Sequence, residues 1–176
     1  ENDDVLDYRE TPLNACSLET FCGGQSIPLC LGCYQLNEST GKREGRLDLY
    51  SIPFDDNDQV LSSVSFGANP PLTVFGDDSE NPAPGVLDGK WSNHAHNTED
   101  AFRNYYATAH ANGEIWVHNI QSSKSSFEAK LAGRSNSPSS SEGLCLALAW
   151  ESPLYSNNNN STDQVLDTRI ISSYSD

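Results

Sequence analysis

The sequence repeats one unit of short apolar runs, twice in full and a third time in part. Each unit has an apolar run, a second run that leads into a polar turn, and a third run in which apolar and polar residues alternate. Such runs are typical of β-strands, because successive side chains on a strand point to opposite faces. We expect strands at residues 13–20, 27–36 and 45–52 in the first copy, 86–91, 106–110 and 113–120 in the second, and 144–150 and 169–176 in the third.

The third strands of the two full copies align residue for residue on Gly45 and Gly113. Leu47 then corresponds to Ile115, and alternate side chains share one face. Repeated groups of short strands are typical of a β-propeller, because one four-stranded blade must stack against neighbours to bury both faces. A β-sandwich also contains short alternating strands and is the alternative. We predict an all-β, partial β-propeller of about two and a half blades, with the blades at about residues 13–75, 85–133 and 143–176.

A ring of about four to eight blades cannot close with this much sequence. We therefore expect residues 1–176 to be the N-terminal part of a single propeller domain in a longer polypeptide. In the third copy, strict alternation puts Leu144, Leu146, Leu148 and Trp150 on one face of the strand and Cys145 with two alanines on the other. This predicts a strand buried on both faces between sheets, which in this chain lacks part of its cover.

The composition restricts the possible partners. The chain has 10 basic and 25 acidic residues, a formal net charge of -15 and a pI near 4.4. Such a field repels phosphate backbones and anionic lipids, so neither nucleic acid nor a membrane surface is expected as a partner. An acidic solvated surface is the simplest explanation, and attraction to a basic protein is the alternative. The longest apolar run, residues 144–150, is too short for a membrane-spanning helix, and the N-terminus has no signal-peptide pattern.

The five cysteines favour a reducing compartment, because an odd number does not fit a disulfide framework. Cys30 and Cys33 have the spacing of a redox or zinc pair, but residues three apart on a strand point to opposite faces. Cys16 and Cys22 complete a four-thiolate zinc site only if these segments are loops. We therefore interpret the cysteines as small buried apolar residues.

One local cluster has the residue types of a metal site. His94 and His96 are followed by Glu99 and Asp100 in a polar connection between expected strands. Solvated histidines and acids are ordinary in such a connection, and this is the simpler interpretation.

Two further histidines lie on or beside expected strands. His110 precedes the turn at Asn112 and Gly113, and His118 lies two residues after Trp116. Either one lines the top or the channel of a propeller, or serves in the turn and in packing, which is the more ordinary role. The sequence has no Gly-x-Ser-x-Gly motif and no phosphate-binding glycine pattern. We name no catalytic residue and expect neither a metal nor a cofactor.

Several segments resemble a known family in the same order along the chain. Residues 32–36 read Gly-Cys-Tyr-Gln-Leu, and residues 43–50 read Arg-Glu-Gly-Arg-Leu-Asp-Leu-Tyr. Together with residues 15–20, they are similar to the first blade of the WD-repeat proteins of diphthamide biosynthesis. That family is the diphthine methyl ester hydrolases, also named diphthine methyltransferases. Residues 85–91, Gly-Val-Leu-Asp-Gly-Lys-Trp, resemble the family's next blade, and residues 147–150 with 170–173 its third.

The resemblance implies a cytoplasmic enzyme that acts on elongation factor 2. It implies hydrolysis of the methyl ester of the diphthine intermediate, with release of methanol and without a cofactor. Thr20, Cys33 and His110 stand where the family usually has Trp, Thr and Asp. The alternatives are a noncatalytic WD-repeat scaffold for protein interactions and an extracellular β-sandwich fragment.

Overall fold

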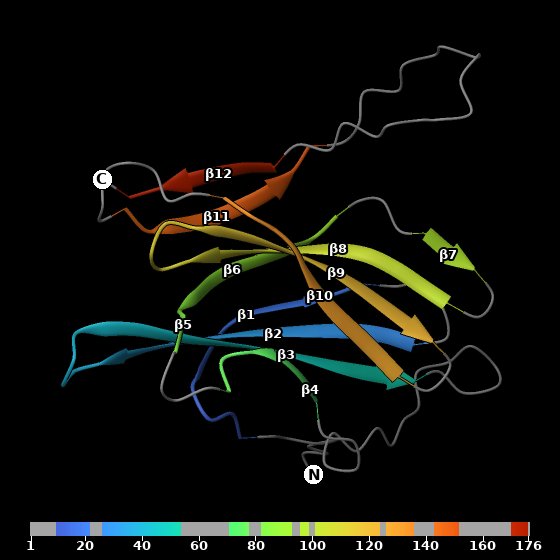
Figure 1. Cartoon of the computed structure of the whole chain (residues 1–176), viewed down its shortest axis with the longest axis horizontal. Helices are drawn as coiled ribbons and strands as arrows, with labels where there is room; N and C mark the ends of the chain where they lie inside the picture. Colours follow the sequence, from blue (N-terminus) through green and yellow to red (C-terminus); the bar gives the residue numbers. More distant parts are fainter. Residues whose placement is uncertain are drawn as a thin grey trace, which may run out of the picture.

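The chain is all-β in a computed structural model, shown in Figure 1, and its described strands form three antiparallel sheets. Within the part of the chain that the structure describes, no helix is long and apolar enough to cross a membrane. The described residues are 10–21, 26–53, 71–77, 82–92, 96–98, 101–123, 126–135, 143–151 and 170–175.

Sheet 1 contains the first copy of the repeat. Its strand order is β1 (Asn14–Thr20), β2 (Ser26–Asn37), β3 (Lys42–Pro53) and β4 (Leu72–Phe75), and the short β5 (Ala83–Pro84) pairs with the other end of β3. The first three strands were predicted. The strands β4 and β5, which are only four and two residues long, were not predicted.

Sheet 2 contains the second copy, and sheet 3 contains the third. The order in sheet 2 is β6 (Val86–Trp91), β8 (Ala101–His110), β9 (Ile115–Ser123) and β10 (Ser126–Arg134), while β7 (His96–Thr98) pairs with β8. Sheet 3 has two strands, β11 (Cys145–Trp150) and β12 (Ile170–Tyr174). The predicted strands of both copies are confirmed, and β7 and β10 are additions.

The first strand of every sheet has a register shift at the same place. Each shift interrupts the pairing with the second strand and lies at the same distance from the end of its own strand. Such irregularities bend and twist a strand locally, so the three first strands share one shape. The shifts fall between Ala15 and Ser17, between Val86 and Asp88, and between Cys145 and Ala147.

The pairing rows at the ends of these strands are equivalent as well. Thr20 pairs with Leu29, Trp91 pairs with Tyr106, and Trp150 pairs with Ile170. In the two larger sheets the row continues to the third strand, where Leu29 pairs with Tyr50 and Tyr106 pairs with His118. Trp91 and Trp150 therefore occupy the same position in their sheets, as the repeat predicts.

The sheets are stacked in chain order, with sheet 2 in the middle (Figure 1). One core lies between sheets 1 and 2 and includes Leu47, Leu49, Trp91 and Tyr106. A second core lies between sheets 2 and 3. Ile115 and Val117 of β9 belong to the second core, and they correspond in the repeat to Leu47 and Leu49 of β3 in the first core. Each of these two sheets therefore packs against the next sheet with the same face.

An indole hydrogen bond joins each pair of neighbouring first strands. The Nε1–H group of Trp91 donates to the carbonyl oxygen of Glu19 at 3.5 Å, and that of Trp150 donates to the carbonyl oxygen of Lys90 at 2.9 Å. Each acceptor is the residue before the last of the preceding first strand. The same side chain thus makes the same backbone contact at both interfaces.

The predicted faces of the β11 strand are wrong. The register shift between Cys145 and Ala147 breaks the alternation, so Cys145 and Leu148 are both buried while Leu146 is 45% exposed. The other face of the strand lacks cover within the described residues, as the sequence predicts for this chain. Trp150 remains partly buried against sheet 2.

The two glycines used to align the third strands have different local roles. Gly113 lies in the β8–β9 turn with a φ of 80°, a conformation that L side chains rarely adopt. Gly45 lies inside β3, because the first hairpin is longer and turns near Gly41, whose φ is 66°. A side chain at Gly45 would come within 2.6 Å of the Gly85 Cα, since the chain around β5 crosses there.

Candidate functional site

A cluster of aromatic and histidine rings lies between β4 of sheet 1 and the β8–β9 hairpin of sheet 2. The ring centroid of Phe75 is 5.6 Å from that of His110, 5.1 Å from that of Trp116 and 5.5 Å from that of His118. The His110 and Trp116 rings are 4.4 Å apart. Strand alternation places His110, Trp116 and His118 on the face of sheet 2 that meets sheet 1.

His110 is fully buried and both of its ring nitrogens are hydrogen-bonded. Nδ1 lies 3.0 Å from the carbonyl oxygen of Pro84, and Nε2 lies 2.8 Å from Oγ1 of Thr108. A carbonyl only accepts, so Nδ1 carries the hydrogen and Nε2 accepts from the threonine hydroxyl. Burial lowers the pKa of His110 to about 4, although the bond to Pro84 acts in the opposite direction. The ring is therefore neutral near pH 7.

His118 is also buried, with 2% of its surface exposed. Burial lowers its pKa to about 4, and a hydrogen bond with the backbone of Tyr106 opposes that shift. Its Nδ1 has no hydrogen-bond partner within the described residues. His110 and His118 therefore both lie in the interior and have the packing role. His110 also begins the turn, where Gly113 N–H donates to its carbonyl oxygen.

An ion pair covers the outer side of Trp116. The guanidinium carbon of Arg134 lies 4.6 Å from the centre of the Trp116 ring, which is a cation–π arrangement. The Glu114 carboxylate accepts hydrogen bonds from the guanidinium of Arg134 and from Nε1–H of Trp116. Partial burial acts to raise the pKa of Glu114, but these hydrogen bonds outweigh it and lower the pKa. The side chains of Glu114, Trp116 and Arg134 thus hold one another in a fixed arrangement.

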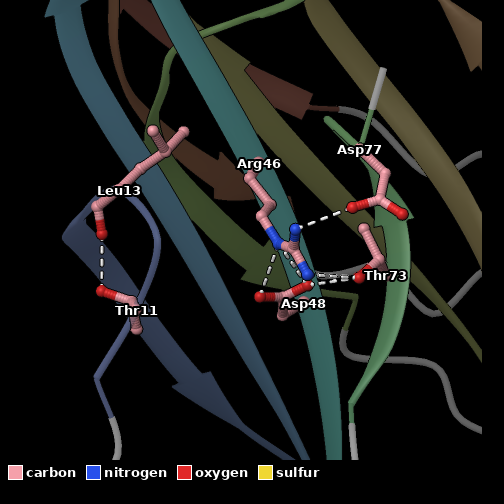
Figure 2. A network of polar contacts seen from close by, with 6 residues as sticks. All are labelled: Thr11, Leu13, Arg46, Asp48, Thr73 and Asp77. Carbon is pink, nitrogen blue, oxygen red and sulfur yellow. Dashed lines mark hydrogen bonds and ion pairs between the residues drawn. The ribbon is translucent and has the colours of Figure 1, made fainter. Parts of the chain in front are cut away.

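A second polar network lies on the β3 and β4 strands of sheet 1. Figure 2 shows the Arg46 guanidinium between the carboxylates of Asp48 and Asp77, with the Thr73 hydroxyl beside it. Arg46 Nε lies 2.9 Å from both oxygens of Asp48, and its other nitrogens donate to Asp77 at 2.9 Å and to Thr73 at 2.6 Å. The Asp48 side chain is 2% exposed. The hydrogen bond to Asp48 is the main cause of the raised pKa of Arg46.

The hydroxyl of Thr73 is not an activated nucleophile. Its oxygen accepts a hydrogen bond from Arg46, and its O–H group donates one to Oδ1 of Asp48 at 2.9 Å. Asp48 is itself held by the same guanidinium, so each member of the network satisfies another. Such a closed set fixes the strands in place and leaves no base free to withdraw the hydroxyl proton.

An open cavity of about 540 Å³ lies between the two networks. A smaller one of about 430 Å³ lies beyond β5, beside Lys42, Arg43 and Asn112. The larger cavity has the size of a small-molecule or peptide side-chain pocket. Its walls include the rings of Phe75 and Trp116, the guanidinium of Arg134 and the carboxylate of Asp77. The cavity can therefore bind a flat apolar group with a polar edge. Residues lining it include Thr73, Phe75, Asp77, Pro84, Trp116 and Arg134.

The possible metal cluster cannot be assembled from the described residues. His94, Glu99 and Asp100 lie outside them, and His96 is described only as the first residue of β7. Within the described ranges, no three His, Cys, Asp or Glu residues lie together as metal ligands.

The four described cysteines are free thiols. Cys30 and Cys33 are buried, as expected, and burial raises the pKa of Cys30 and raises that of Cys33 to about 11. Cys145 is buried too, but the expectation is wrong for Cys16, which is exposed because it lies in the register shift of β1. Cys22 lies outside the described residues.

Sequence reasoning identified the two histidines of this site but missed the groups that surround them. Phe75 and Arg134 come from β4 and β10, strands that were not predicted. Arg46 and Asp48 alternate on one face of β3, and this spacing was the one available signal. The partner residues Thr73 and Asp77 meet them only through β3–β4 pairing.

No family model, no curated protein and no solved structure matches this chain significantly. The candidate site is therefore defined by the chain's own residues and geometry.

Proposed function

We propose that the chain is the N-terminal part of a WD-repeat β-propeller that hydrolyses the methyl ester of the diphthine intermediate on elongation factor 2. The enzyme would act in the cytoplasm, use no metal or cofactor, and release methanol. Residues 1–176 would supply the first two blades and the start of the third.

The propeller part of the proposal is supported by the repeated geometry of the three sheets. Their first strands share one register shift, and the indoles of Trp91 and Trp150 bind the preceding sheet in the same way. Stacked copies with one repeated interface are what a ring of blades requires. A β-sandwich, the alternative, packs two sheets face to face, whereas sheet 2 here is covered on both sides.

The hydrolase part is carried by the ordered resemblance of residues 32–36 and 43–50 to the first blade of that family. These two segments lie on the neighbouring strands β2 and β3, where Gly32 pairs with Leu47. The resembling residues are thus parts of one hairpin and not scattered similarities.

The described residues do not supply the chemistry of ester hydrolysis. That reaction needs an attacking oxygen, a base that activates it and donors for the developing oxyanion. His110 and His118 are neutral but buried, so neither reaches a substrate. In a propeller such groups converge from several blades, and we expect residues 1–176 alone to be inactive.

The proposal is tested in cells and with purified protein. Cells that lack the whole protein should accumulate methylated diphthine on elongation factor 2, and the purified whole protein should release methanol from that species without added metal. Unchanged diphthamide in the deletion strain would refute the hydrolase assignment. Turnover by residues 1–176 alone would instead place the reactive groups in the first blades. His94 and His96 would then be the first to replace, ahead of the buried His110.

The burial of His110 and His118 favours a second candidate, a noncatalytic scaffold. In that case the cavity beside Trp116 and Arg134 would bind a segment of another protein. An Arg134→Ala variant separates the two functions. It should weaken partner binding by a scaffold and leave methanol release by an enzyme unchanged, since Arg134 is paired with Glu114 and is not a reactive group.

A further inference from the structure

The larger cavity, between the two polar networks, has an exposed carboxylate whose position is fixed by the backbone. Asp77 lines this cavity, and its side chain is 79% exposed. Gly76, the residue before it, has a φ of 91°, and a Cβ there would lie 2.7 Å from Cα of Arg46. The chain therefore passes directly against β3 at this glycine, and Asp77 is held beside the Arg46 guanidinium.

The ion pairs around the cavity leave one negative charge in excess. In sheet 1 the single guanidinium of Arg46 is shared by two carboxylates, the buried one of Asp48 and the exposed one of Asp77. On the side of sheet 2, the charges of Arg134 and Glu114 cancel. Oδ1 of Asp77 accepts from Arg46, whereas its Oδ2 accepts no hydrogen bond from the described residues. The excess charge therefore lies on Asp77, at the cavity.

Aromatic side chains form another part of the wall. The rings of Phe75 and Trp116 line the cavity, with their centroids 5.1 Å apart. His110 and His118 contact Phe75 and are neutral near pH 7, because burial lowers the pKa of both to about 4. The guanidinium of Arg134 already lies over the Trp116 ring. The wall therefore offers aromatic surface of a kind that a cation approaches favourably.

An arginine side chain has the chemistry that suits this cavity. A guanidinium is planar and weakly hydrated, stacks on aromatic rings and donates hydrogen bonds along its edge, whereas a lysine ammonium is a compact and strongly hydrated charge. The net charge of -15 attracts basic partners, and an anion would be repelled by Asp77 and by the chain as a whole. Lys42 and Arg43, which would favour an anion, line the separate cavity beyond β5.

We infer that the cavity is a docking site for an arginine side chain on an extended segment of a basic partner protein. The edge of the guanidinium donates to Oδ2 of Asp77, and its face and aliphatic stem pack on Phe75 and Trp116. Naming arginine deepens the scaffold function proposed above and rests on it for the source of the side chain. The hydrolase proposal is not involved.

The test is an NMR titration of the 176-residue chain with the peptide Gly-Ser-Arg-Ser-Gly, acetylated and amidated at its ends, at an ionic strength of about 0.15 M. The amides of Gly76 and Asp77 and the indole N–H of Trp116 should shift, with a dissociation constant of about 1 mM. A peptide with citrulline in place of arginine keeps the shape without the charge and should bind at least about threefold more weakly. A lysine peptide should bind at least about twofold more weakly.

Asp77→Asn removes the excess charge, keeps an oxygen for Arg46 and should weaken binding of the arginine peptide by about three- to fivefold. Glu128→Gln is the matched control. It makes the same change of charge at an exposed position about 20 Å along β10 from Arg134, beyond the screening length, and should change binding by less than about 1.5-fold.

Equal losses in the two variants, equal binding of the citrulline or lysine peptide, or no shifts with about 10 mM arginine peptide would overturn the arginine site. In the whole protein, partner binding that is unchanged by Asp77→Asn would overturn the partner as the source of the arginine. Methanol release is a separate measurement, so a failure of this site and a failure of the hydrolase proposal are distinguishable.

Discussion

The two interfaces between consecutive sheets share one backbone contact but are filled differently. At both, an indole donates to the carbonyl of the preceding first strand. Between sheets 1 and 2 the space is filled by large rings, with Trp91 4.9 Å from Tyr106 and 5.8 Å from Phe21. Between sheets 2 and 3 the buried side chains are aliphatic or small, Ala107, Ala109, Cys145 and Leu148, and the partly buried Ile115, Val117, Trp150 and Ile170 pack around them.

This difference shows that the repeat determines the backbone contact between neighbouring sheets but not the side chains that fill the space between them. The position of the indole depends on the register of the first strand, which is the same in every copy. The side chains between the sheets vary because several combinations fill the same volume. The first interface also contains the buried histidines, so it should respond to changes that leave the second unaffected.

The largest expected effect is the loss of an indole. Trp91→Ala should reduce the free energy of opening of the β6 amides by about 3–5 kcal/mol, because Trp91 is 7% exposed among aromatic neighbours. Trp150→Ala should reduce the free energy of opening of the β11 amides by only about 2 kcal/mol, since the Trp150 ring is only partly buried. Hydrogen exchange measures both values. A larger loss at β11 than at β6 would reverse the comparison.

Acid should loosen the first interface before the second. His110 and His118 have a pKa of about 4 in the folded chain, below the ordinary value of 6.5, so the unfolded state binds more protons between these values. Stability at this interface should therefore be full above about pH 6.5 and fall as the pH drops toward 4, by on the order of 3 kcal/mol for each histidine.

The pH effect is measured by hydrogen exchange of β8 and β11 amides between pH 7 and 4, corrected for the intrinsic pH dependence of exchange. His118→Gln should flatten the profile of β8, because an uncharged side chain then replaces one titrating group. Parallel losses in β8 and β11 with no effect of this variant would contradict the assignment of the acid response to the histidines.

A methyl group at Gly32 should disturb the first interface alone. An added Cβ there would contact Ser17 and would lie 2.6 Å from Cγ1 of Val86, so Gly32→Ala should destabilise β6 by about 1–3 kcal/mol. Gly133→Ala is the matched control on β10, where an added Cβ meets nothing within 4 Å, and it should change stability by less than about 0.5 kcal/mol. Equal effects of the two substitutions in exchange experiments would argue against close packing of β2 and β6.

The smallest expected effect sharpens the description of the second interface. The carboxylate of Asp88 accepts a hydrogen bond from Leu148 N–H at 2.9 Å, across the two sheets. Asp88→Ala should reduce the free energy of unfolding of β11 by about 1–2 kcal/mol, because the partly buried amide of Leu148 loses its acceptor. Asp88→Asn retains an acceptor oxygen and should cost less. If the asparagine and alanine variants destabilise β11 equally in urea titrations followed by Trp150 fluorescence, the hydrogen bond is not the cause.

Most strands could be predicted from the sequence because their apolar runs are local signals. The bounds of β6, residues 86–91, match the prediction residue for residue. The short β4 has no such signal, since four residues do not define a periodicity. The faces of β11 were mispredicted because a register shift depends on the partner strand, and nothing in residues 144–150 reveals that Leu146 is the extra residue.

The candidate site was only partly predictable for a similar reason. His110 and His118 stand out in the sequence, but their burial depends on Phe75 from a different sheet. The ion pair of Arg46 with Asp77 joins residues that are brought together only when β4 pairs with β3. Residue types could therefore be singled out, whereas their neighbours required the three-dimensional arrangement.

The central claim is that the three sheets are copies of one unit with a repeated interface. An experimental structure of the chain tests it most directly, by superposing β1–β2, β6–β8 and β11–β12. The account predicts that the Trp91 and Trp150 indoles coincide and that each Nε1–H donates to the preceding first strand, at Glu19 and Lys90. Indoles that face different layers, or that contact no neighbouring first strand, would contradict it.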